Sequence, residues 1–269
     1  QIDQVLGILK MIDIASSTPN YKLAIQNVGI KNLDYSVMIP NQGKGIANFN
    51  MTIGLNADKR GTHMSRFIEV LQQQDWEMNI KSLFEMHNII EHKFDSKISS
   101  ISAAFTLLIE KSAPISGIKS LSDYKINYIS EQLNDVNKYF IKIEIPVTTL
   151  CPCSKSISKY GAHSQRTKIS VCIEVNDDLN LTSLIRSMEK CGSSELYSLL
   201  KREDEKFVTE TAYDNPKFVE DSVREAANTL QEMDKIKTFS VIVESLESIH
   251  NHSAIAKICS AGFTNPEFV

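Results

Sequence analysis

Residues 168–175 read Lys-Ile-Ser-Val-Cys-Ile-Glu-Val, and they indicate the fold more clearly than any other stretch. The isoleucines and valines occupy every second position, so their side chains would all point to one side of an extended chain. Most of the residues between them are polar or charged. This period of two predicts a β-strand with one buried face and one solvated face, which is typical of antiparallel sheets.

Strands and apolar helical stripes follow one another in a similar order in both halves of the chain. In the first half, strands are expected at residues 22–30, 49–55, 99–109 and 124–129, and helices at residues 64–71 and 80–90. In the second half, strands are expected at residues 140–146, 169–175 and 239–243, and helices at residues 181–190, 196–202 and 216–235. This order predicts an α+β protein with two modules of the same type, residues 1–133 and 134–269, joined near Leu133–Asn137.

Composition and charge exclude several classes of protein. Of the 269 residues, 42% are hydrophobic and 23% are charged, which is ordinary for a globular protein and argues against a disordered chain. The net charge of −4 argues against a dedicated nucleic-acid-binding protein. No apolar run approaches the roughly 18 residues that a membrane-spanning helix needs, so we expect no membrane span.

The cysteines and the first residues of the chain indicate a cellular compartment. The five cysteines form an odd set without the spacing of a disulfide framework. Residues 1–17 contain no basic segment followed by an apolar run, so we predict no signal peptide, reduced thiols and a cytoplasmic location. Because the sequence begins with glutamine rather than methionine, we expect the native N-terminus to lie upstream.

The most unusual local motif is Cys151-Pro152-Cys153-Ser154-Lys155, which follows a predicted strand, with His163 twelve residues after its first cysteine. Thiolate and imidazole groups bind transition metals and take part in nucleophilic catalysis. Two cysteines separated by one residue are a weaker metal signal than paired motifs with two residues between the cysteines. A structural role for these residues, at a strand end and in a loop, therefore fits the spacing equally well.

The same stretch is locally basic. Residues 151–168 contain four cations and no acidic residue, namely Lys155, Lys159, Arg166 and Lys168. In an acidic chain this asymmetry suits a phosphate or carboxylate ligand, although any single lysine here is explained equally by a solvated loop. Gly61–Phe67, at the start of a predicted helix, is a second candidate phosphate contact, and a structural helix entry explains it nearly as well.

Two histidines and a glutamate further along are also candidates. His250 and His252 stand two residues apart after a predicted strand, so both side chains can reach one site. Glu205 lies in the mixed-charge run Lys201–Lys206, which by itself is typical of a solvated surface. Only partners elsewhere in the fold would make Glu205 a ligand.

Glu220 stands at the head of a predicted helix. Asn215 is the expected N-cap, with Pro216 at the first helical position. Glu220 shares a face with Val223 and Ala227, which predicts a buried, ionised carboxylate stabilised by the positive end of the helix dipole. Such a group can bind a ligand edge that has two N–H donors, and a capping or interface role is the alternative.

Together these motifs resemble the type IB GTP cyclohydrolases. The matches occur in order over about residues 60–255 and comprise Gly61–Phe67, Thr148–Lys155, Tyr160–His163, Tyr197–Arg202, Asp204–Lys206, Val208–Glu210, Phe218–Asp221 and Glu247–Ser253. The sequence departs from the pattern of this family at two places, and neither contains a residue given below as a metal ligand. Glu203 stands where a proline is expected in relatives, and residues 192–196 differ from the usual pattern.

The resemblance implies a fold and a reaction. The fold is two tandem tunnelling-fold modules per chain, each an antiparallel sheet backed by helices, and the chains assemble as a homotetramer. The reaction converts GTP and water to 7,8-dihydroneopterin triphosphate and formate, the first step of folate-type pterin biosynthesis. One divalent metal ion per active site, Zn²⁺, Mn²⁺ or Fe²⁺, would activate the water that attacks C8 of guanine. Neither a nucleic acid nor a membrane is an expected partner.

The resemblance also implies residue roles. The metal ligands would be Cys151, His163, Glu205 and His250. Cys153 would be the second active-site thiol, and His252 or His163 would donate a proton to N7 of the purine. Glu220 would accept hydrogen bonds from N1–H and the 2-amino group. Charge alone suggests further triphosphate contacts, some of them from a neighbouring subunit, at Lys155, Arg166, Lys201, Arg202, His63 and Arg66.

Two other functions remain open from the sequence. One is a different tunnelling-fold enzyme acting on a purine or pterin, which would keep Glu220 but need not keep Cys151 together with His250. The other is a non-catalytic metal-binding scaffold, in which four ligands leave no position for water. Turnover of another purine or pterin, with GTP inert, would indicate the first alternative. Loss of pterin product after Cys153→Ala, with metal retained, would exclude the second.

Overall fold

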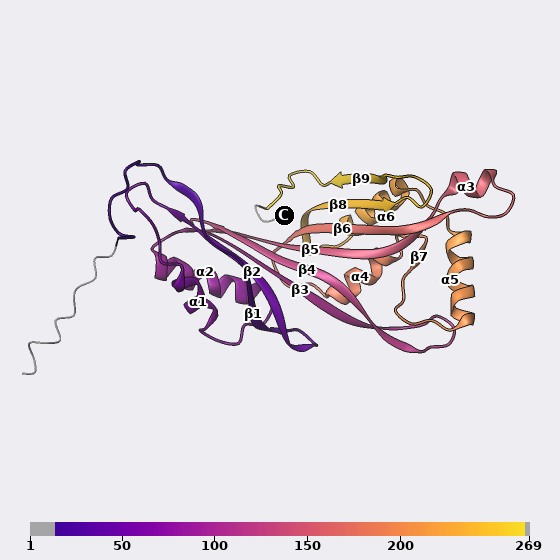
Figure 1. Ribbon diagram of the computed structural model, residues 1–269, viewed down its shortest axis with the longest axis horizontal. Helices are drawn as coiled ribbons and strands as arrows, with labels where there is room; N and C mark the ends of the chain where they lie inside the picture. Colours follow the sequence, from indigo (N-terminus) through magenta and orange to yellow (C-terminus); the bar gives the residue numbers. More distant parts are fainter. Residues whose placement is uncertain (1–13, 267–269) are drawn as a thin grey trace, which may run out of the picture.

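The computed structural model describes residues 14–266, which form one long antiparallel sheet with helices packed against it (Figure 1). The strand order is β1-β2-β3-β4-β5-β6-β8-β9, and a short strand, β7, pairs with β5. None of the helices within residues 14–266 is long and apolar enough to cross a membrane. The prediction of no signal peptide rests on residues 1–17, of which residues 1–13 lie outside the described residues.

The first half follows the order strand, strand, helices, strand, strand, and the second half follows the same order with the short helix α3 and the short strand β7 added. The first half consists of β1 (Ile25–Ile39), β2 (Gly43–Leu55), α1 (Ser65–Leu71), α2 (Ile80–Phe94), β3 (Ile98–Ser112) and β4 (Lys119–Leu133). The second half consists of β5 (Val136–Leu150), α3 (Pro152–Ile157), β6 (Ser164–Val175), α4 (Leu181–Glu189), β7 (Ser194–Glu195), α5 (Arg202–Asp214), α6 (Val219–Gln231), β8 (Ile236–Leu246) and β9 (Ser253–Cys259). The predicted α+β class, an antiparallel sheet backed by helices, is confirmed.

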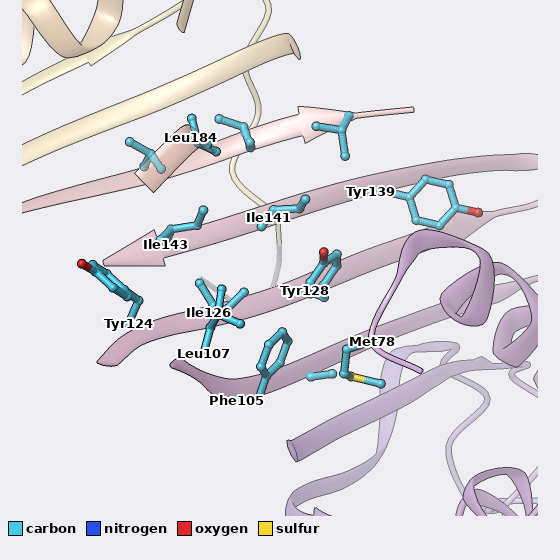
Figure 2. Packing of buried hydrophobic residues seen from close by; sticks show 14 of the residues in the cluster. Met78, Phe105, Leu107, Tyr124, Ile126, Tyr128, Tyr139, Ile141, Ile143 and Leu184 are labelled. Carbon is cyan, nitrogen blue, oxygen red and sulfur yellow. The ribbon is translucent and has the colours of Figure 1, made fainter. Parts of the chain in front are cut away.

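The hydrophobic core lies on one face of the sheet and continues across both halves. Strand register places Ile126 of β4 opposite Ile143 of β5, and Ile143 opposite Val171 of β6. Figure 2 shows side chains of β3, β4 and β5 close together in this layer. The apolar sides of α2, α4 and α6 belong to the same cluster, so the helices cover the face to which residues 169, 171, 173 and 175 point. The strand predicted from residues 168–175 is confirmed.

The opposite face is mainly polar, with one apolar patch near its centre. Ile129, Phe140 and Cys172 are buried there, and Phe263 packs on them, its ring edge-on to that of Phe140 with centroids 6.5 Å apart. Cys172, expected on the solvated side of its strand, is therefore buried. Burial raises the pKa of its thiol to about 12, so Cys172 stays protonated.

The ladder between β4 and β5 joins the two halves. It runs from Leu133 opposite Val136 to Lys125 opposite Glu144. Asn134 in the connecting turn has a φ of 54°, a left-handed conformation that asparagine tolerates. The predicted module boundary at residues 133–134 coincides with this turn, whereas the sheet and its core continue across it. The division into two modules stays a prediction.

One predicted helix is wrong, and two helices, α3 and α5, were not predicted. Residues 196–202 were expected to be helical, but residues 196–201 form no regular structure after Ser194–Glu195 pairs with β5, and α5 begins only at Arg202. The backbone of this segment has partners elsewhere: Ser193 N donates to Thr148 O, and Leu196 O accepts from Lys111 Nζ. The helix that follows, α5, has few buried side chains, which explains why its sequence lacks an apolar stripe.

The last helix starts later than predicted. Its N-cap is Phe218 rather than Asn215, and the Asp221 carboxylate accepts a hydrogen bond from Phe218 N. Asn215 instead ends α5, and its Nδ2 donates to the carbonyl oxygens of Gly192 and Ser193. Pro216 therefore lies in the connection between two helices. The helix also ends at Gln231 instead of residue 235.

A buried ionic cluster also links the two halves. Lys111 Nζ, on β3, lies 2.7 Å from Glu189 Oε1 at the end of α4 and 2.9 Å from Glu195 Oε2 on β7. Tyr124 on β4 donates its hydroxyl hydrogen to Glu189 Oε1 at 2.6 Å. Burial, together with the Glu189 carboxylate, raises the pKa of Tyr124, which keeps this phenol neutral. The lysine thus compensates a carboxylate that is almost completely buried.

Replacing Lys111 tests this link. Because Lys111→Met leaves Glu189 buried without its cation, the free energy of unfolding should fall by about 3–5 kcal/mol. The matched control is Lys119→Met, which breaks an exposed ion pair with Glu110 and should change stability little. Urea denaturation of both variants measures the difference, and equal effects would contradict a stabilising role for the buried cluster.

His87 is the only fully buried histidine among residues 14–266. It lies on α2, where Nδ1 is 2.6 Å from Ser99 Oγ and Nε2 is 2.8 Å from Ser130 Oγ, both on the core side of the sheet. Removal from water lowers the pKa of His87 to about 4. The ring is therefore neutral at physiological pH and bridges α2 to β3 and β4.

The depressed pKa of His87 predicts a loss of stability in mild acid. As the pH falls from about 6.5 to about 4, the unfolded chain binds a proton at His87 that the folded chain does not, which favours unfolding. At about 1.4 kcal/mol per pKa unit, this group contributes up to about 3 kcal/mol of the loss. His87→Gln keeps hydrogen-bonding groups without a titratable ring, so its stability should depend less on pH in this window. Identical pH profiles in chemical denaturation would contradict the prediction.

Candidate active site

The turn between β5 and β6 carries the two-cysteine motif. Cys151 is the N-cap of α3, and its Sγ accepts a hydrogen bond from Ser154 N at 3.4 Å. Pro152 occupies the first turn, where a residue without N–H is tolerated. Cys151 N donates to His163 O at 3.1 Å, which continues the β5–β6 ladder beyond Leu150. The two residue types predicted to act together are therefore neighbours at the end of the sheet.

The loop between β8 and β9 approaches the same turn. Ser248 Oγ lies 3.4 Å from His163 Nδ1, although the two residues are 85 positions apart. Further along this loop the rings of His250 and His252 stack with centroids 5.2 Å apart, and His250 Nδ1 lies 3.8 Å from Glu247 Oε2. Both predicted loop histidines thus belong to a segment that contacts the His163 turn.

The predicted metal ligands fit a transition metal by chemistry and only partly by position. Sulfur, imidazole nitrogen and carboxylate oxygen form a mixed set typical of catalytic sites. Within residues 14–266, however, no three histidine, cysteine or acidic side chains lie close enough to hold one ion. Cys151 and His163 are joined by a backbone hydrogen bond, whereas Glu205 is exposed on α5. The four-ligand set stays a prediction.

Glu220 is exposed, so its predicted burial is wrong. The buried row of α6 includes Val219, Val223, Ala226 and Leu230. Glu220 follows Val219 by one residue, which turns its side chain about 100° away from the centre of the apolar stripe. Its predicted role as a ligand anchor is untested by this geometry, and an exposed carboxylate at the start of a helix is free to meet a ligand or a second chain.

Four of the six predicted triphosphate contacts lie near the β5–β6 end of the molecule. Lys155 Nζ lies 4.3 Å above the ring of Tyr213 and also donates to the carbonyl oxygen of Tyr213. Lys201 and Arg202 are exposed at the start of α5. Arg166 lines a hollow of about 450 Å³ on the polar face of the sheet.

The other two predicted contacts lie elsewhere. Arg66 is on α1, and its Nη1 donates to Lys93 O at 3.0 Å. His63 lies just before this helix. Figure 1 shows α1 and α3 at opposite ends of the sheet. A single chain therefore does not bring His63 and Arg66 to the Cys151 turn.

A second hollow, of about 720 Å³, adjoins the turn. It lies between residues 159–164, the end of β5 and the α5 residues Val208, Thr209, Ala212 and Tyr213. Its volume is in the range of small-molecule sites. Nearby Tyr160 and Ile157 are 90% and 85% exposed, so this end of the molecule presents large apolar side chains.

Asp204 is an important residue of this region that the sequence analysis did not single out. Its fully buried carboxylate accepts hydrogen bonds from Ile115 N at 2.8 Å, Ser116 N at 2.9 Å, Ser116 Oγ at 2.6 Å and Lys201 N at 2.9 Å. Burial alone would raise its pKa, but these hydrogen bonds outweigh that effect and hold the pKa well below its usual range. Asp204 thereby fixes the start of α5, which carries Glu205, to the β3–β4 turn. The sequence signal that could have identified Asp204 is its place three positions after the helix N-cap, Lys201, where an acidic side chain often accepts from the N-cap backbone.

Fold and site together define a tunnelling-fold protein with a cysteine–histidine turn at one end of its sheet. The solved structure of a hyper-thermostable uricase mutant has the same fold, with a TM-score of 0.50 over 90% of this chain and 94% of that chain. At 12% sequence identity the likeness concerns the fold alone.

The sequence comparisons identify the family. The family model described as type I GTP cyclohydrolase folE2 matches residues 11–256, so the chain belongs to this family. GTP cyclohydrolase FolE2 of Nitrosococcus oceani is 42% identical over 250 residues, which cover 91% of this chain and 94% of the relative. The corresponding protein of Geotalea uraniireducens is 44% identical over 252 residues, 92% of this chain and 93% of the relative. The family predicted from the motifs is confirmed.

Asp204→Asn tests the anchoring of α5. An amide offers only one acceptor oxygen where two carboxylate oxygens now receive four hydrogen bonds, so the β3–β4 turn should loosen. Hydrogen exchange at the amides of Ile115 and Ser116 should accelerate by about tenfold or more. Asp221→Asn, which alters the equivalent position of α6, is the matched control and should leave these two amides unchanged. Unaltered exchange in Asp204→Asn would contradict the anchoring role.

Proposed function

We propose that this protein converts GTP and water to 7,8-dihydroneopterin triphosphate and formate, the first step of folate-type pterin biosynthesis. The observation that carries the proposal is the Cys151–His163 turn, with the β8–β9 loop beside it, in a chain that matches the GTP cyclohydrolase family over residues 11–256. The adjoining hollow of about 720 Å³ offers room for a nucleotide base.

We also propose that one divalent metal ion, Zn²⁺, Mn²⁺ or Fe²⁺, is held by Cys151, His163, Glu205 and His250. The backbones of Cys151 and His163 are hydrogen-bonded at the β5–β6 turn, and Ser248 Oγ lies 3.4 Å from His163 Nδ1, so the loop that contains His250 approaches the same turn. Asp204 fixes the helix start from which Glu205 projects. When bound, such an ion supplies a water of lowered pKa as the nucleophile for C8 of guanine.

The remaining groups would bind and protonate the substrate. His252, whose ring stacks on that of His250, is a candidate proton donor to N7 of the purine during attack at C8. Cys153 is exposed on α3, two residues from Cys151. Its thiol would be accessible to the five-membered ring of guanine as that ring opens. Glu220 would accept from N1–H and the 2-amino group, and Lys155, Arg166, Lys201 and Arg202 would meet the triphosphate.

The working form would be a homo-oligomer, and the family leads us to expect a tetramer. It would act in the cytoplasm. Its active sites would combine residues of two copies, since His63 and Arg66 lie at the opposite end of the sheet from α3 (Figure 1). The exposed Glu220 and Tyr160 are then available to a neighbouring copy. A reducing compartment agrees with the five free cysteines.

Turnover of metal-stripped protein tests this function. Formate, and a pterin that becomes fluorescent after oxidation, should appear from GTP only when Mn²⁺, Fe²⁺ or Zn²⁺ is added back. Cys153→Ala should retain metal and lose about 100-fold or more of the activity if the thiol takes part in proton transfer. Cys259→Ala, which alters an exposed cysteine on β9, is the matched control and should remain active.

Two other outcomes would overturn the proposal. Tight metal binding without product from GTP would indicate a non-catalytic scaffold. Turnover of a different purine or pterin, with GTP inert, would indicate another tunnelling-fold enzyme.

A further inference from the structure

A row of polar side chains continues the apolar core at the end of the sheet nearest to Cys151. Thr149 on β5 pairs with Gln165 on β6, and Thr167 pairs with Ser245 on β8. Strand alternation places all four on the face that carries the core residues Val147, Ile169 and Val243. Thr149, Thr167 and Ser245 are at most 2% exposed, so their hydroxyl groups are removed from water.

These buried hydroxyl groups bond to one another. Thr149 Oγ1 lies 2.7 Å from Thr167 Oγ1, and Thr167 Oγ1 donates to Ser245 Oγ at 3.1 Å. Each hydroxyl has one hydrogen to donate. Because Thr167 donates its hydrogen to Ser245, Thr149 must donate to Thr167. The other hydrogen bond of Thr149 is therefore one that it accepts, and Gln165 Nε2 donates it at 3.2 Å.

The direction of these hydrogen bonds determines how the Gln165 amide faces His163. With Nε2 turned towards Thr149, the amide oxygen Oε1 lies 2.9 Å from His163 Nδ1. An amide oxygen only accepts hydrogen bonds, so Nδ1 must carry the hydrogen of the neutral imidazole. Nε2 then keeps its lone pair. Ser248 Oγ, 3.4 Å from Nδ1, is able to accept as well and agrees with this assignment.

We infer that Thr149, Thr167 and Ser245, acting through Gln165, are positioning residues that set the tautomer of His163. The inference rests on the proposed role of His163 as a metal ligand and deepens it, because it names Nε2 as the nitrogen presented to the ion. Histidine ligands commonly have their second N–H held by an acceptor, and loss of such a partner typically lowers metal affinity about 10–100-fold. Here the acceptor is itself oriented by hydroxyl groups inside the sheet.

Thr149→Val tests the inference, since valine has the shape of threonine without its hydroxyl. The tautomer of His163 is read from ¹⁵N chemical shifts of histidine-labelled protein, and Zn²⁺ affinity from competition with a chelator. Wild type should show hydrogen at Nδ1. In Thr149→Val the Nε2–H tautomer should grow and Zn²⁺ affinity should fall about tenfold or more, whereas Thr149→Ser should restore both.

Thr52→Val is the matched control. It removes a hydroxyl that donates to Asn27 Oδ1 on the same sheet, outside the His163 network, and should change neither reading. Gln165→Leu provides a second test if Thr149→Val does not fold, because Gln165 is only half-buried. In Gln165→Leu, Zn²⁺ binding should weaken and the Nε2–H tautomer of His163 should grow, as in Thr149→Val.

The inference is overturned if wild-type His163 carries its hydrogen on Nε2. It is also overturned if both Thr149→Val and Gln165→Leu keep the wild-type tautomer and Zn²⁺ affinity. Neither measurement uses GTP. Failure of the proposed cyclohydrolase activity, seen as no product from GTP, is therefore distinguishable from failure of this inference.

Discussion

The hydrogen-bond ladder between β4 and β5 is the constraint on which the rest of the structure depends. It makes one sheet of the two halves and sets the register in which β5 meets β6. Because side chains alternate along a strand, a slip by one residue would turn Ile141 and Ile143 from the helix-covered face to the polar face. The same register carries Gln165 and Thr167 to the core side, so the surroundings of His163 follow from it.

The fold was predictable where one face of a strand is buried and less so where tertiary contacts decide. Most strand centres were predicted correctly, although β1 was predicted only up to residue 30 and continues to Ile39. Strand β5 continues through Pro146 because β4 no longer pairs with it beyond Glu144. Helix α5 was missed because Asp204 and Ala212 are its only buried residues. The edge strand β9 was missed because it is short and its apolar pattern is weak: Ala254, Ala256 and Ile258 pack against the core, whereas Ile255 is largely exposed.

The candidate site was predictable from residue types and less so from geometry. Cys151 and His163 were found because thiol and imidazole groups are chemically distinctive, and the sheet brings them together. Thr149 and Thr167 gave no such signal, since threonine is common in strands and only their pairing across β5, β6 and β8 gives them a role. Glu220 was misjudged because the stripe of α6 is centred one residue away, on Val219.

The contact between Asp204 and the β3–β4 turn limits how this chain can change length. Hairpin tips are usually places where residues are inserted or deleted without harm. Here Ile115 and Ser116 donate to a carboxylate at the start of α5, so one extra residue in the tip would withdraw those donors. The damage would appear around Glu205, some ninety residues further along the chain. A loop that looks free to evolve is thus expected to keep its length.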